Sequence, residues 1–228
     1  MRLHRLFLRF PSSWMLRLAA KRRMHEERRM NPTKNDMSRD LRGKMVKLLS
    51  DRLVDTIDLF NQLKQAHWNV KGPSFIAIHE LFDQIAEHAE EWSDDIAERA
   101  VQMGGMVDGT AQTVAQRTTL EPYDASITDG LAHVDAIAAA LARYGQQVRK
   151  AIDAADKAGD AGTTDLFTQV SRAVDKDLWF VEAHLQNAEP DTAHASDKAP
   201  NGKQLPNGKV SSKAAPTAGR AKNRHALS

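Results

Sequence analysis

Five residues between positions 67 and 98 have the types and the spacing of metal ligands. They are two imidazoles and three carboxylates: His67, His79, Asp83, Asp94 and Glu98. His79 and Asp83 are four residues apart, and so are Asp94 and Glu98. On an α-helix this spacing brings two side chains within reach of one ion. Imidazole together with carboxylate oxygens suits iron better than copper or a structural zinc ion. The pattern therefore predicts histidine–carboxylate iron chemistry.

Four of these candidates lie on one face of a predicted helix. With His79 at 0° and one residue every 100°, Asp83, Asp94 and Glu98 fall at about 40°, 60° and 100°. The apolar residues of the same helix fall between about −60° and −140°. They are Ile78, Phe82, Ile85, Ala89, Trp92, Ile96 and Met103. The candidate ligands are thus predicted to point away from the core of the protein.

A solvated acidic surface is the simpler interpretation of this face, because Glu87 and Glu90 also lie on it. The two pairs at helical spacing favour the metal site instead. So does His67, which ends the preceding apolar pattern beside a glycine turn at Gly72. A turn of that kind can fold His67 back towards the next helix.

The distance between the two pairs sets the kind of site. Fifteen residues separate His79 from Asp94, which is about 22 Å along one helix, so the two cannot bind one ion within a chain. If two copies of this helix pair antiparallel about a two-fold axis, each histidine end meets the Asp94 end of the other copy. Bundles with an internal di-iron site use Glu-x-x-His on two helices. No histidine of this chain has a glutamate three positions before it.

Four helical patterns must position these side chains. Apolar residues at helical spacing cover residues 41–63, 75–103, 127–152 and 166–185. Ser38 or Asp40 can cap the first pattern, Gly104-Gly105 can end the second, and a break at 159–164 precedes the fourth. The connection at 106–126 has no sustained pattern and is longer than a tight turn. This order predicts an all-α, ferritin-like four-helix bundle with one long crossover between helices two and three.

Both ends of the chain are basic. We expect three parts: an N-terminal extension at 1–37, the bundle at 38–188 and a C-terminal tail at 189–228. The tail has no aromatic residue, and after Asp197 it has seven basic residues and no acidic one. That composition buries too little apolar surface to order itself, so we expect a flexible basic tail.

Residues 1–23 contain seven Arg and Lys residues and no acidic residue. Three interpretations stay open: a basic arm for an anionic polymer, an organelle transit sequence, or translation from an upstream start with Met24 or Met30 as the true beginning. Arg17 interrupts the apolar part, which argues against a secretory signal. The chain has no cysteine, which fits a reducing compartment. It also has no run of roughly 18 apolar residues, so we expect no membrane span.

The ordered motifs resemble those of the Dps family, the DNA-binding proteins from starved cells or mini-ferritins. The residues that carry the resemblance are His67-Trp68-Asn69-Val70-Lys71-Gly72, His79-Glu80-Leu81-Phe82-Asp83, Asp94, Ala97-Glu98-Arg99, Gly104-Gly105, Asp175-Lys176 and Leu178-Trp179-Phe180. The resemblance covers roughly residues 35–187 and implies a subunit of a hollow homo-dodecamer. It also implies ferroxidase sites at two-fold interfaces. There His67, His79 and Asp83 would come from one subunit, and Asp94 and Glu98 from its partner.

The resemblance further implies a cytoplasmic, nucleoid-associated protein that oxidises iron(II) and stores iron(III) mineral in its shell. Hydrogen peroxide would be the preferred oxidant, with dioxygen as the other. Many basic tails on one particle would add non-specific, salt-sensitive DNA binding, since no base-reading motif is present. Two alternatives stay open: an iron-storing mini-ferritin that does not bind DNA, and a protein that mainly compacts the nucleoid.

A few other polar residues have both a functional and a structural interpretation. Trp68 could intercept stray radicals beside His67 or pack at the helix end. Four acidic residues could line an iron-entry pore, although a solvated loop explains them as well: Asp153, Asp156, Asp160 and Asp165. We expect His88 and His133 to be surface or structural residues rather than ligands.

Overall fold

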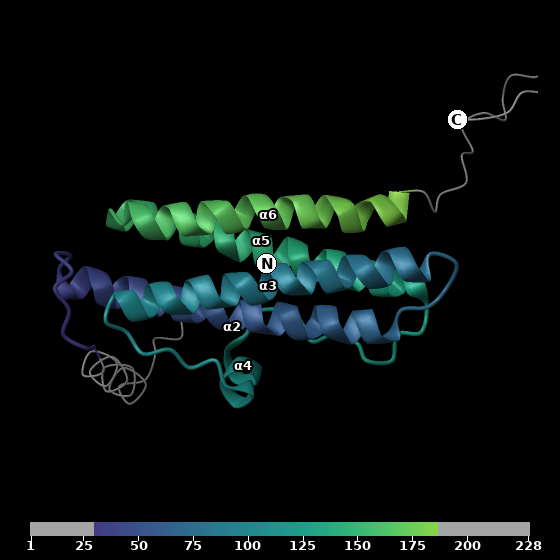
Figure 1. Cartoon of the computed structure of the whole chain (residues 1–228), viewed down its shortest axis with the longest axis horizontal. Coiled ribbons are helices and arrows are strands. Elements are labelled where there is room, and N and C mark those ends of the chain that lie inside the picture. Colours follow the sequence, from purple (N-terminus) through teal and green to yellow (C-terminus); the bar gives the residue numbers. More distant parts are fainter. Residues whose placement is uncertain (1–29, 187–228) are drawn as a thin grey trace, which may run out of the picture. The chain divides into compact units, whose positions relative to one another are not determined.

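The computed structural model describes residues 30–186, which form five α-helices and no β-strand within that range (Figure 1). The helices are α2 (Arg39–Asn69), α3 (Phe75–Gln102), α4 (Ala111–Arg117), α5 (Gly130–Ala158) and α6 (Ala161–Gln186). The four long helices lie side by side, and α4 lies in the connection from α3 to α5. The predicted all-α four-helix bundle with a long crossover is confirmed. The predicted N-terminal arm, up to residue 29, and the predicted C-terminal tail lie outside the described residues.

The predicted caps are found at the start of α2 and at the end of α3. The Ser38 hydroxyl accepts the Leu41 N–H at 3.2 Å and caps α2. At the end of α3, the Gly104 and Gly105 N–H groups donate to the carbonyls of Val101 and Ala100, at 2.8 and 3.0 Å. Gly104 has a φ of 87°, and a Cβ there would lie 2.6 Å from the Asn31 carbonyl oxygen. Only glycine fits this C-terminal cap without strain.

Two predicted helix boundaries are wrong. The expected break at 159–164 is only Gly159 and Asp160, because Gly159 ends α5 at a φ of 82° and Asp160 caps α6 at once. α5 begins at Gly130, three residues later than its apolar pattern, since Asp129 caps it through the Ala132 N–H. The connection also contains the seven-residue helix α4, which is too short to show a periodic pattern.

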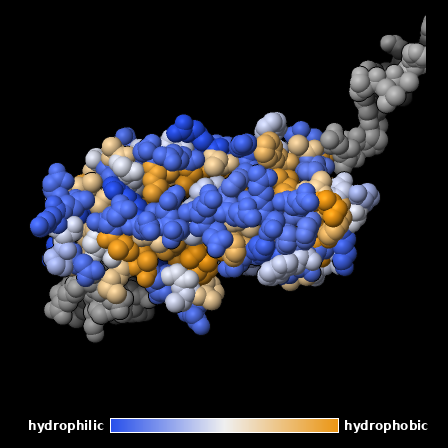
Figure 2. Space-filling model, viewed as in Figure 1, coloured by the Kyte–Doolittle hydropathy of each residue, from blue (hydrophilic) through white to orange (hydrophobic). Residues whose placement is uncertain are grey.

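The core lies between the apolar faces of the four long helices. On α3 the predicted apolar face is buried, with Phe82, Ile85 and Ile96 fully inaccessible. α2 packs on α3 and α5, and α5 packs on α6. Each large core side chain contributes roughly 1.5–3 kcal/mol by its burial. The outer surface is polar where the inner face of α3 is apolar. Figure 2 shows a hydrophilic band that crosses the visible face along the line of α3.

None of the described helices is both long enough and apolar enough to cross a membrane.

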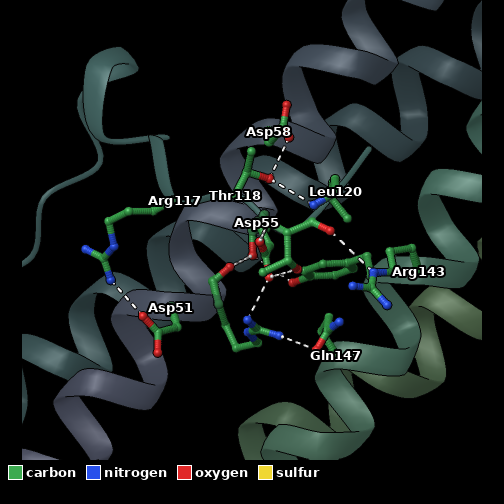
Figure 3. Close-up of polar contacts among 12 residues, drawn as sticks. Asp51, Asp55, Asp58, Arg117, Thr118, Leu120, Arg143 and Gln147 are labelled. Carbon is green, nitrogen blue, oxygen red and sulfur yellow. Dashed lines mark hydrogen bonds and ion pairs between the residues drawn. The ribbon is translucent and has the colours of Figure 1, made fainter. Parts of the chain in front are cut away.

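A buried polar network anchors the crossover to the bundle (Figure 3). The fully buried Asp55 carboxylate pairs with the Arg52 guanidinium at 2.8 Å and accepts the Thr119 N–H at 2.7 Å. Arg52 also donates to the Gln147 side-chain oxygen of α5, at 3.3 Å. Burial raises the pKa of Asp55, and Arg52 opposes that rise by favouring the charged carboxylate. One carboxylate thus ties α2 to the crossover, and its ion-pair partner ties α2 to α5.

Replacing Asp55 with alanine should lower the free energy of unfolding by about 3–5 kcal/mol, because it leaves the Arg52 guanidinium buried without its carboxylate. The matched control is Asp51→Ala on the same helix. Asp51 pairs with Arg117 at 2.7 Å, but both side chains are about one-third exposed. That variant should lose less than about 1 kcal/mol. Urea unfolding followed by circular dichroism at one protein concentration measures both, and equal losses would contradict the prediction.

Candidate metal centre

The end of α2 and the start of α3 bring two imidazoles together. The rings of His67 and His79 are stacked, with centroids 3.7 Å apart and planes 20° apart. The link between the helices folds back at Gly72, which has a φ of 115° and whose carbonyl accepts the Phe75 N–H at 3.1 Å. The predicted return of His67 towards His79 is therefore seen in the structure.

Reciprocal hydrogen bonds to the backbone fix both rings. The Nδ1 atom of His67 lies 2.8 Å from the His79 carbonyl oxygen, and that of His79 lies 2.9 Å from the His67 carbonyl oxygen. A carbonyl oxygen only accepts, so both Nδ1 atoms carry the proton. In the neutral rings each Nε2 therefore keeps its lone pair. A backbone carbonyl orients metal-binding histidines in the same way.

Asp83 is the carboxylate nearest to this pair of rings. Its Oδ1 lies 3.9 Å from His67 Nδ1 and accepts a hydrogen bond from Lys64 Nζ at 2.5 Å. The Lys64 hydrogen bond is the main reason that the pKa of Asp83 lies below its usual value. Asp83 is therefore a carboxylate rather than a carboxylic acid at neutral pH. Two imidazoles and one anion converge at this end of α3.

Asp94 and Glu98 lie on the same helix but far from this group, at about 22 Å for the fifteen residues between His79 and Asp94. Both side chains are exposed, whereas His79 and Asp83 are half-buried. Within residues 30–186, no group of three or more histidine or acidic side chains is close enough to hold a metal ion. In one copy of the chain His67, His79 and Asp83 therefore lie at one end of α3, away from Asp94 and Glu98, and neither set could hold a metal ion by itself.

Lys64 is the residue at this site that the sequence reasoning missed. It precedes His67 by three residues on α2, a spacing that puts both side chains on the same side of the helix. The sequence shows this neighbourhood, but it does not show that α3 places Asp83 opposite. Trp68, next to His67, is 67% exposed. Within one chain it therefore does not pack at the helix end, which was the structural alternative to a role in intercepting radicals.

The acidic residues considered for a pore fall into two kinds. Asp160 is fully buried and pairs with Arg99 at 2.8 Å, while its carboxylate also accepts the Thr163 N–H at 3.1 Å. Asp160 is therefore a buried helix cap that pairs with Arg99, and it fits neither the pore nor the solvated loop that were considered from the sequence. The other three residues are exposed: Asp153, Asp156 and Asp165.

The two histidines that we expected to be structural have partners inside the bundle. His88 Nδ1 lies 3.0 Å from the Asp177 carboxylate, and burial raises the pKa of Asp177 against the effect of His88. His133 is almost fully buried, and its Nδ1 lies 2.6 Å from the Tyr123 hydroxyl. Burial lowers the pKa of His133 and raises that of Tyr123 to about 12. Neither histidine lies with other candidate ligands in a metal-binding group of the described chain.

The chain is similar to known proteins in sequence and in fold. A family model of the ferritin-like domain matches residues 46–190. The DNA protection during starvation protein of Agrobacterium fabrum is 45% identical over 157 residues, which cover 68% of this chain and 95% of that protein. The protein of the same name from Mycolicibacterium smegmatis is 30% identical over 155 residues, which cover 68% of this chain and 84% of that protein.

Among solved structures, DpsA14 from Streptomyces coelicolor has 34% identity and a TM-score of 0.64, over 68% of this chain and 94% of that chain. The resemblance seen in the sequence motifs is thus confirmed by independent similarity of sequence and of fold. The chain belongs to the Dps family of ferritin-like proteins.

Proposed function

We propose that the chain is a ferroxidase that oxidises iron(II) at sites shared between two subunits and stores the iron(III) product. One observation carries the proposal. The reciprocal hydrogen bonds of His67 and His79 leave both Nε2 lone pairs free, and the charged Asp83 lies 3.9 Å from His67 Nδ1. Two fixed imidazoles and a carboxylate make half of a site for a divalent cation of intermediate hardness.

A second copy of the chain supplies the other half. Asp94 and Glu98 are exposed on the helix that carries His79. Antiparallel pairing of two α3 helices about a two-fold axis places this end of one copy against the histidine end of the other. Each of the two resulting sites then has two imidazoles and three carboxylates. Membership of the Dps family supports a hollow shell of twelve such subunits.

The ligand set favours the product of the reaction. Three carboxylates stabilise iron(III) more than iron(II), because the attraction grows with the charge of the ion. Two iron(II) ions each give one electron to one hydrogen peroxide molecule, whose O–O bond breaks to leave two hydroxide ions. A two-electron reduction of this kind consumes the peroxide without releasing hydroxyl radical. The protein thereby removes both reagents that damage DNA.

The C-terminal tail supports a second role in binding DNA. After Asp197 it carries seven basic residues and no acidic one. Each of twelve such tails on one particle would bind DNA phosphates weakly, and the twelve tails together would bind DNA tightly. The relatives named DNA protection during starvation protein support this role. On this proposal the protein acts in the cytoplasm, at the nucleoid. An iron-storing shell that does not bind DNA is the alternative.

Two inactive variants should restore activity to each other when they are co-expressed. One chain carries His79→Ala and Asp83→Ala, and the other carries Asp94→Ala and Glu98→Ala. A mixed pair has one intact site of two, and half of randomly formed pairs are mixed. The mixture should therefore oxidise iron(II) with peroxide at about a quarter of the normal rate. Each variant alone should be inactive, as followed by iron(III) absorbance after anaerobic loading.

A matched control for the lost charges is the Asp95→Asn, Asp135→Asn protein, in which two exposed carboxylates outside the predicted site are neutralised. It should keep the normal rate. Failure of the two inactive variants to restore any activity, in particles that contain both chains, would contradict a site shared between subunits.

Light scattering tests the assembly. Twelve copies of the 25.3 kDa chain should give a particle of about 300 kDa, whereas the two-fold contact alone would close at a dimer of about 50 kDa. A stable monomer would leave every site half-built and is incompatible with the proposal.

Gel retardation tests the role in DNA binding. A chain that ends after Glu189 should retain DNA less well at low salt, and the full chain should lose affinity steeply as salt rises. A full-length control with glutamine at the seven basic positions separates the charge of the tail from its length. Undiminished retention by both variants would move DNA binding to the N-terminal arm or remove it.

A further inference from the structure

The Lys64 ammonium holds the carboxylate that the metal needs. Its Nζ lies 2.5 Å from Asp83 Oδ1, and the two side chains are 24% and 41% exposed. Lys64 belongs to α2 and Asp83 to α3, so the pair joins the two helices that carry the imidazoles. His67, on the same side of α2 as Lys64, lies 3.9 Å from the same carboxylate oxygen. The ammonium therefore lies inside the candidate centre rather than beside it.

A cation that arrives at Asp83 competes with this ammonium. A lysine head is a compact positive charge with three donors, and a divalent ion at the same oxygen would lie within a few ångströms of it. The two positive charges repel each other at that distance. Lys64 must therefore swing away before Asp83 can bind the ion fully, and its four-carbon chain gives it the reach to do so.

The same charge helps before the cation arrives. In the proposed pair of subunits, Asp94 and Glu98 of a second copy approach Asp83, so three carboxylates meet. Like charges at an interface oppose association unless a cation lies among them. Lys64 supplies that cation from within the chain.

We propose that Lys64 is a positioning residue, an internal counter-cation that holds Asp83 ready, supports the subunit interface and is displaced by iron(II). It thereby weakens metal binding at the histidine end and keeps this end of the site reversible. This inference rests on the proposed ferroxidase function. It has a signature that an ordinary structural ion pair lacks, because removing Lys64 should strengthen metal binding and weaken association of the metal-free subunits.

The test is a titration of the full-length assembled protein with cobalt(II). The visible absorption of this ion reports its coordination, so binding is measured without peroxide. The Lys64→Gln protein should bind cobalt(II) about fivefold more tightly than the unaltered protein, the change expected from losing one partly exposed ion pair. The Lys64→Arg protein keeps the charge and should bind as the unaltered protein does. Lys64→Met, with a chain of similar length, serves as a second neutral variant.

The matched control is Lys47→Gln. Lys47 lies on the same helix and pairs with Asp51 at 2.6 Å, away from the candidate ligands. It should leave cobalt(II) binding unchanged. Dissociation of the metal-free particle on dilution, followed by light scattering, gives the second measurement. Both neutral variants at position 64 should dissociate at a higher protein concentration than the unaltered protein.

The outcomes separate this inference from the proposal on which it rests. Unchanged or weaker cobalt(II) binding in both Lys64→Gln and Lys64→Met, with the unaltered protein binding normally, would overturn the role of Lys64 alone. If the Asp94→Ala, Glu98→Ala protein bound cobalt(II) as tightly as the unaltered protein, the shared site itself would be wrong.

Discussion

Two hydrogen bonds between imidazoles and backbone carbonyls fix the geometry on which the candidate centre depends. The His67 carbonyl lies in the last turn of α2, where a helix leaves its carbonyls without partners, and the His79 ring donates to it. The His67 ring donates in return to the His79 carbonyl in α3. A single pair of residues thus closes the end of one helix, orients the next and sets the protonation of both rings. Loss of either ring would remove the stacking contact at 3.7 Å but leave the backbone carbonyl that orients the other ring.

In the proposed ferroxidase site, the geometry of α3 makes activity depend on assembly. One face of this helix is buried in the core, and the opposite face carries candidate ligands at both ends. A straight helix cannot bring its two ends together, so the ligand groups meet only between copies. An isolated chain would bind iron poorly, and the reaction would begin only where a closed shell can collect its product. The helix therefore stabilises each subunit and, in the proposed assembly, would also form the contact between subunits.

The sequence predicts those features that depend on neighbours along the chain. The buried face of α3, the Ser38 cap and the Gly104 turn follow from local spacing. The start of α6 does not, because its first turn is polar and Asp160 caps it while pairing with Arg99 on α3, sixty-one residues away. Lys64 is missed for the same reason, since its partner lies on another helix. The fold brings His67 and His79 together as the turn suggested, whereas the joining of both ligand groups remains a prediction about two chains.

The carboxylates of the chain show why a cation is needed where subunits meet. Inside the bundle, Asp55 and Asp160 each have an arginine, and Asp177 has His88. Each buried anion therefore has a partner from its own chain, as the cost of burying a lone charge requires. Asp94 and Glu98 are exposed in one chain and would lose water when a second copy covers them. In the proposed interface their compensation would come from the other subunit, first from Lys64 and then from iron. Association of subunits and binding of the substrate are then coupled through one set of charges.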